Sequence, residues 1–194
     1  MMRLPLIFLA LTGALVSPAL AHTGVNSATS FASGVAHPLG GADHVTVMVA
    51  VGLWAVLRGN SALWVWPTTF VAVMLIGGAL GMTHIAIPFV EPGILASVVA
   101  LGLMVALAAD LQVPVGATII GAFALLHGHA HGTEAADTLN GLEYMAGFAL
   151  ATATLHALGI GFALILQRIA LRTAVRLAGA GCAAIGVGLF SGAL

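Results

Sequence analysis

Lysine is absent from this chain, cysteine occurs once, and charged residues of all kinds make up 6% of the 194 positions. The five basic residues are all arginines, too few to form the basic surface by which proteins bind nucleic acid. The single cysteine, Cys182, excludes an internal disulfide and a paired-cysteine metal site, and its Gly/Ala surroundings favour a packing role. No Walker-type phosphate loop occurs, so direct use of ATP is not expected.

Hydrophobic residues account for 61% of the chain, and the mean hydropathy is +1.15, which is typical of a polytopic membrane protein. Six apolar segments are long enough to span a bilayer core, which needs about 20 helical residues. They lie near 37–57, 62–83, 93–109, 113–131, 139–166 and 172–193. The connectors between them are too short to hold a soluble domain. The expected fold is therefore an all-α bundle of six transmembrane helices, forming one domain over residues 22–194.

Glycine is abundant, with 25 residues, and two pairs have the spacing of helix-packing motifs. Gly77 with Gly81, and Gly188 with Gly192, are four residues apart, which lets helix backbones approach closely in lipid. Tight helix packing explains most of these glycines without any functional role.

The N-terminus has the features of a secretion signal. Arg3 supplies the positive end, residues 4–16 supply the apolar stretch, and Ala19-Leu20-Ala21 is a small-x-small cleavage pattern. We therefore expect residues 1–21 to be a cleaved signal peptide, in preference to an uncleaved first helix. The mature N-terminus would then lie in the periplasm, and the protein in a bacterial inner membrane.

The distribution of charge gives an independent test of this orientation. With the N-terminus outside, the cytoplasmic ends of the predicted helices carry every mature arginine: Arg58, Arg168, Arg172 and Arg176. The outer connectors carry acidic residues instead: Glu91, Glu134 and Asp137. This asymmetry is the one that the positive-inside rule predicts.

Two short clusters hold five of the eight histidines and two of the six carboxylates. In the first cluster, residues 37–44, Pro38 fits the first turn of a helix with His37 at its cap. His44 lies seven residues after His37, so both imidazoles are expected on one helix face, with Asp43 beside them as a ligand or as a partner of an imidazole. Ionisable groups next to lipid are energetically costly. We therefore interpret His37, Asp43 and His44 as metal ligands, in preference to polar residues that happen to lie at the membrane interface. Met48, one turn further, is better explained by packing.

The second cluster, residues 127–134, ends the fourth predicted helix. His127 and His131 are one turn apart, the spacing by which two helical histidines bind one metal ion. Glu134 would complete the same face if the helix continued, although Gly132 suggests that it frays there. The topology puts both clusters at the outer rim, so they are predicted to form one shared site.

These motifs resemble those of the HupE/UreJ family of hydrogenase- and urease-associated nickel permeases. Residues 37–44 are similar to the family's His-x5-Asp-His motif, and residues 126–134 to its Phe-His-Gly-x-Ala/Val-His-Gly-x-Glu motif. Leu126 stands where the family has Phe, a departure that affects packing and not ligation. The resemblance covers essentially the whole chain. It implies that six residues are needed for transport: His37, Asp43, His44, His127, His131 and Glu134.

Five further residues are weaker candidates for the metal path: His22, His84, His129, Glu143 and His156. His22 is best explained as part of a mobile terminus. For His84, exposure to solvent and metal binding are equally good interpretations. His129 occupies a variable position of the motif, and Glu143 has capping-box spacing from Asn140. His156 lies deep in the fifth predicted helix, where a path ligand and a packing histidine are equally good interpretations.

The function predicted is uptake of a divalent transition metal from periplasm to cytosol, with nickel favoured by the resemblance and cobalt as the alternative. No prosthetic group is expected, and the partners are lipid and the transported ion. The oligomeric state is left open. Uptake should decline as the pH falls through the unperturbed histidine pKa of about 6.5, because metal ligands must be deprotonated. Two other classes compete: a membrane metalloenzyme that uses the histidine cluster, and a periplasm-facing metal sensor.

Overall fold

The computed structural model describes residues 30–136, 140–169 and 171–194. The predicted signal peptide and His22 lie outside these residues. Within them the protein is all-helical, as expected, with seven helices and no strand. The helices are α2 (Phe31–Gly40), α3 (Ala42–Arg58), α4 (Ala62–Met82), α5 (Val90–Ala106), α6 (Val113–Ala135), α7 (Gly141–Arg168) and α8 (Arg172–Ser191).

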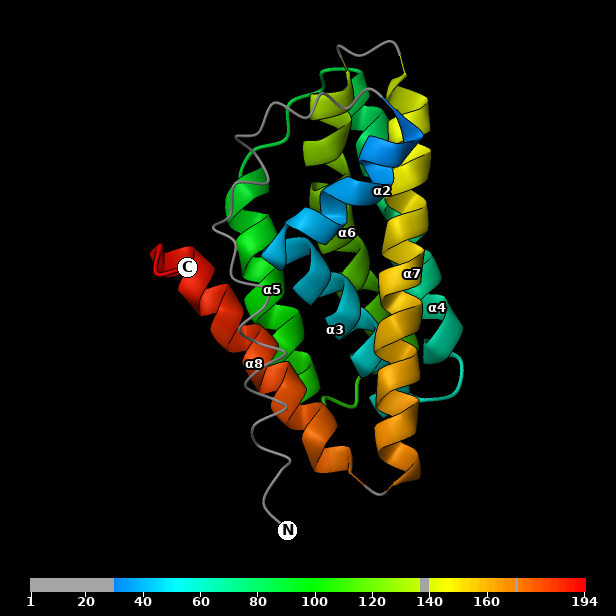
Figure 1. Ribbon diagram of the computed structural model, residues 1–194, viewed down its shortest axis with the longest axis vertical. Helices are drawn as coiled ribbons and strands as arrows, with labels where there is room; N and C mark the ends of the chain where they lie inside the picture. Colours follow the sequence, from blue (N-terminus) through cyan, green and yellow to red (C-terminus); the bar gives the residue numbers. More distant parts are fainter. Residues whose placement is uncertain (1–29, 137–139, 170) are drawn as a thin grey trace.

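The helices form an elongated bundle in which α4, α5, α6 and α7 run roughly along the long axis (Figure 1). The most extensive packing joins α4 to α6 and α5 to α8, while α2 and α3 both pack on α7. Large side chains fill the interior, among them Trp54, Trp66 and Phe70, which are fully buried. The ring nitrogens of Trp54 and Trp66 donate to the carbonyl oxygens of Ala109 and Val113, so these buried polar groups are satisfied.

Four helices are long and apolar enough to cross a membrane: α4, α6, α7 and α8. The pair α2 and α3 passes the same test together, but it is bent by 86° at its break. Helix α5 is apolar and has 17 residues, which is about 26 Å of helix against a hydrocarbon core of about 30 Å. The protein is therefore a multi-pass membrane protein, and the part of the chain that the structure describes contains four such helices, or five if the bent pair is one span.

The bend overturns one expectation about the first histidine cluster. His37 and Pro38 do not begin a helix, because Ser30 and Ser33 form a capping box that starts α2 seven residues earlier than His37. Pro38 falls in the last turn of α2, and Gly41 follows with an extended backbone (φ −101°, ψ 121°). His37 and His44 therefore lie on two different helices, and not on one face of a single helix.

Glycines let α4 and α6 pack with their backbones in direct contact. A Cβ atom added at Gly77 or Gly81 would clash with a carbonyl oxygen of α6, which confirms the packing role predicted for this pair. Gly128 and Gly132 are the matching positions on α6, facing the backbone of α4. The second predicted pair does not act in this way, because Gly192 is the left-handed C-cap of α8.

All four described arginines lie at one end of the bundle. Arg58 and Arg168 end α3 and α7, and Arg172 and Arg176 are in the first turns of α8. The Arg58 Nε donates to the Leu111 carbonyl oxygen at 2.8 Å and forms an ion pair with Asp110 at 3.0 Å. This end, at the bottom of Figure 1, is opposite the end at which α6 finishes and α7 begins.

Candidate metal centre

His44 is fully buried in the first turn of α3, and the residue before it fixes its orientation. The His44 Nδ1 lies 2.7 Å from the Asp43 Oδ1. An ionised carboxylate only accepts hydrogen bonds, so this contact puts the ring proton on Nδ1. The lone pair of His44 is then on Nε2, which points away from α3 into the bundle.

His131 is held in the same way near the end of α6. Its Nδ1 lies 3.1 Å from the Glu134 Oε2, and the His131 side chain is fully buried. The expectation that α6 frays at Gly132 was wrong, since the helix continues to Ala135. Gly132 serves the contact with Gly78 of α4 and does not end the helix. Glu134 therefore stays one turn from His131, where it holds the imidazole.

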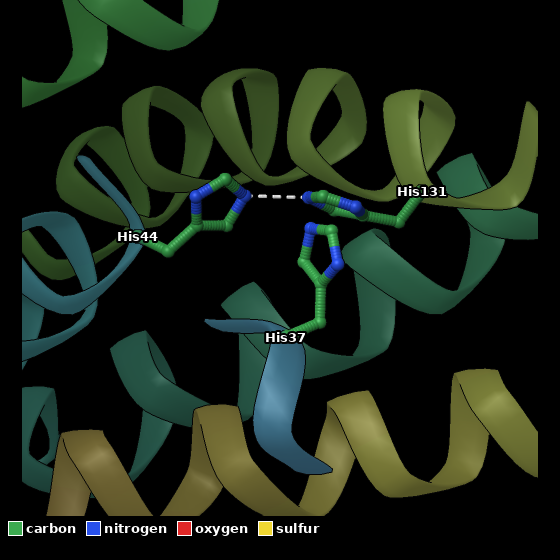
Figure 2. Close-up of side chains that lie close together, drawn as sticks. All are labelled: His37, His44 and His131. Carbon is green, nitrogen blue, oxygen red and sulfur yellow. Dashed lines mark hydrogen bonds between the residues drawn. The ribbon is translucent and has the colours of Figure 1, made fainter. Parts of the chain in front are cut away.

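The two Nε2 atoms of His44 and His131 face each other at 2.5 Å (Figure 2). A hydrogen bond between them needs a proton on one Nε2, in addition to the proton that each ring donates to its carboxylate. Without a proton or a cation between them, two lone pairs would point at one another. Paired carboxylate–imidazole units of this kind are the arrangement by which proteins orient histidine toward a metal ion.

His37 brings a third imidazole from the end of α2 (Figure 2). Its ring centroid is 4.6 Å from that of His131 and 5.9 Å from that of His44. One ligand nitrogen from each of the three rings lies within 4.8 Å of the others. Three imidazoles with carboxylates behind them suit a borderline divalent cation. We name His37, His44 and His131 the histidine triad.

Two aromatic residues of α7 enclose the triad, and sequence reasoning missed both of them. The Phe148 ring centroid lies 4.3 Å from that of His131 and 6.0 Å from that of His44. The Tyr144 centroid lies 5.9 Å from that of His37. Both side chains are buried and exclude water from one side of the triad. In the sequence they are indistinguishable from ordinary core positions.

His127 is fully buried one turn from His131, on the side of the triad nearer the arginine end. Its ring is 5.3 Å from that of His44 and perpendicular to it, but it is not one of the three clustered nitrogens. The His127 Nε2 lies 3.0 Å from the hydroxyl of Ser97, a residue of α5 that sequence reasoning missed. His127 therefore lies next to the triad but is not part of it.

Comparison with known proteins gives the wider relationship. Residues 9–189 match the protein family described as HupE / UreJ protein. The chain is 44% identical over 179 residues to Protein HupE of Rhizobium leguminosarum bv. viciae, an alignment that spans 92% of this chain and 93% of that protein. The chain belongs to the HupE/UreJ family. No solved structure matches it.

HupE/UreJ proteins are transport and accessory proteins connected with nickel or cobalt, and they are not enzymes. Membership therefore confirms the prediction that the chain is not an enzyme, and it removes the metalloenzyme alternative. The two HupE/UreJ-like motifs are the segments that meet in the structure, since His37 and His44 come from the first and His131 from the second. Motifs separated by more than 80 residues thus supply one cluster.

The four weaker candidates that the structure describes lie apart from the triad in this HupE/UreJ protein. The His129 Nε2 is 2.6 Å from the Ile85 carbonyl oxygen, to which it donates. His84 is exposed in the turn after α4, with a left-handed backbone (φ 57°), and Glu143 is exposed in the first turn of α7. His156 is 1% exposed, further along α7, and contacts the Phe70 ring edge-on at 5.1 Å.

Proposed function

We propose that this protein is a nickel permease that carries Ni²⁺ from the periplasm to the cytosol, where it supplies a hydrogenase or a urease. The observation that carries the proposal is the pair of opposed Nε2 atoms of His44 and His131, each oriented by a carboxylate. A divalent cation between them would remove the conflict between two lone pairs. A cation bound there would take the place of a proton that bridges the two nitrogens.

The carboxylates also supply the charge that a dehydrated cation needs. Asp43 is 5% exposed, and the Glu134 side chain is 33% exposed, so one carboxylate is buried and the other reaches the solvent side. Together they would neutralise a divalent ion held by the triad, which lowers the cost of taking it out of water. Glu134 also lies 3.9 Å from the His37 Nε2, at the more open edge of the triad. We infer that the ion enters along this edge.

The position of the triad relative to the arginines supports this direction of transport. The triad lies toward the end of the bundle opposite Arg58, Arg168 and Arg172, and positive residues favour the cytoplasmic side. Under this orientation the triad faces the periplasm of an inner membrane. We infer six spans, counting α2 with α3 as one broken span and α5 as a short one. Broken helices at membrane depth are a common element of transporter sites.

The choice of nickel over cobalt depends on the family and on the donor set. Imidazole and carboxylate without thiolate suit Ni²⁺ and Co²⁺, and they disfavour Cu⁺, which prefers sulfur. Affinity alone would favour Cu²⁺, so discrimination must come from geometry. The relationship to hydrogenase- and urease-associated proteins supports nickel, and cobalt remains the second candidate.

Reconstitution of the full chain in sealed vesicles tests this function. The parent protein should raise luminal nickel saturably, without ATP, while His44→Ala should transport no more than protein-free vesicles. His84→Ala is the matched control, because His84 is an exposed histidine outside the triad, and it should transport like the parent. A parent protein that binds nickel without delivering it to the lumen would be a sensor, and the permease function would be wrong.

A further inference from the structure

A second buried histidine lies beyond the triad, on the side toward the arginine end. His156 is 1% exposed, and neither of its ring nitrogens has a hydrogen-bond partner among the residues that the structure describes. Burying an imidazole without partners is costly, and an apolar residue would fill the same space without that cost. A packing role alone therefore does not explain why the position is histidine.

His156 belongs to a continuous buried face of α7 that begins at the triad. Phe148, Thr152 and His156 are spaced by four residues, so they lie one above another on the helix. Phe148 contacts His131, and eight residues of helix bring the chain about 12 Å further inward to His156. From His156 to Arg168, at the end of α7, is about 18 Å more. His156 thus lies between the triad and the inner end.

Helix α4 supplies a matching pair of residues opposite this face. The Thr152 hydroxyl donates to the Met74 Sδ at 3.6 Å, and both residues are fully buried. One turn from Met74, the Phe70 ring contacts His156 at 5.1 Å and His127 at 5.8 Å between ring centroids. The same aromatic ring therefore separates the last histidine beside the triad from His156.

We propose that His156, with the thioether of Met74 and the hydroxyl of Thr152, is a second and weaker binding station for the transported cation. The inference rests on the proposed permease function and adds a step to it. Imidazole, thioether and hydroxyl are neutral donors that a borderline cation accepts. The ion would pass from the triad to His127, and then past Phe70 to His156.

The two stations differ in charge, and we expect them to differ in affinity. Asp43 and Glu134 lie at the triad, whereas the other described carboxylates lie at helix ends and none is in the layer of His156. A divalent ion held only by neutral donors binds weakly and leaves readily. Conduction needs this combination, because a site must bind tightly enough for entry and loosely enough for release.

The test compares two substitutions of nearly equal size at one position. His156→Leu removes both ring nitrogens of this position, whereas His156→Met puts one soft donor there on an apolar side chain. In proteoliposomes, His156→Leu should lower maximal nickel uptake at least tenfold with half-saturation unchanged, and His156→Met should recover most of that loss. A packing histidine predicts instead that the two variants behave alike, and that result would overturn the proposal.

Equilibrium binding provides a readout that does not depend on transport. At high nickel concentration, the parent in detergent should bind a second, weaker ion that His156→Leu lacks, while the tight ion stays. Equal stoichiometry in the two proteins would count against the station. If His156→Leu loses the tight ion as well, its fold is disturbed, and the Met74→Leu variant is the test instead. Slower uptake by Met74→Leu with unchanged tight binding supports the station, whereas uptake equal to that of the parent refutes it. A parent without uptake would refute the permease function itself.

Discussion

The Nε2 atoms of His44 and His131 lie 2.5 Å apart, although the Nδ1 of each ring already faces a carboxylate. The two histidines come from α3 and α6, 87 residues apart in the chain. Each carboxylate is on the same helix as its imidazole, so either half of the site is built locally and the helix packing only has to bring the halves together. The fixed rings direct two nitrogens to one point, where they could serve as two ligands of one metal ion.

Asp43→Asn should weaken metal binding while preserving the shape of the site. The amide is close in size to the carboxylate, but it has no charge and does not fix the His44 proton on Nδ1. Loss of such an outer partner typically lowers metal affinity by about 10–100-fold. Calorimetric titration of the purified protein with nickel measures this change in affinity.

Glu143→Gln is the matched control for this substitution, because Glu143 is an exposed carboxylate outside the triad. It should leave the affinity within about twofold of the parent, since it removes the same charge without touching an imidazole. An equal loss in both variants would mean that the protein's overall negative charge, and not the Asp43–His44 contact, governs binding.

Substitutions in the two motifs should not add. His44→Ala and His131→Ala each remove half of one shared site, so either should abolish saturable uptake, and the double variant should be no worse than the single ones. Transport measured for the four proteins, at equal amounts of protein in the membrane, decides this. Residual uptake in each single variant, with a further loss in the double variant, would indicate two independent sites.

The sequence predicted the all-helical membrane fold, and it predicted that the two distant motifs would lie close together because the expected topology puts both at the outer rim. It failed at the break between α2 and α3. Proline followed by glycine is compatible with the start of one helix or the end of another, and the Ser30 cap lies outside the segment that hydropathy selects. Tyr144 and Phe148 were missed because a buried aromatic residue beside a metal site has the same sequence pattern as one in an ordinary core.

The glycine contact between α4 and α6 predicts how sensitive the site is to packing. A Cβ atom at Gly128 would clash with the carbonyl of Met74 and the backbone of Gly78, so Gly128→Ala should force the helices apart. Overpacking of this kind costs about 1–3 kcal/mol of folding stability. It should also move His127 and His131 and weaken nickel binding.

Gly161→Ala is the matched control, because a Cβ atom there meets nothing within 4 Å. It should leave folding stability and nickel binding unchanged. Thermal unfolding in detergent and nickel titration test the pair, and equal behaviour of the two variants would contradict the contact.

Competition between metals tests the identity of the transported ion. Three imidazoles and two carboxylates accept nickel, cobalt and zinc, and the Irving–Williams order ranks nickel above cobalt at any site of this type. A nickel permease, as proposed, must also discriminate against zinc by the geometry of its site. We therefore expect excess nickel to suppress cobalt uptake into vesicles more strongly than excess zinc does. If excess nickel leaves cobalt uptake untouched, nickel is the wrong assignment and cobalt takes its place.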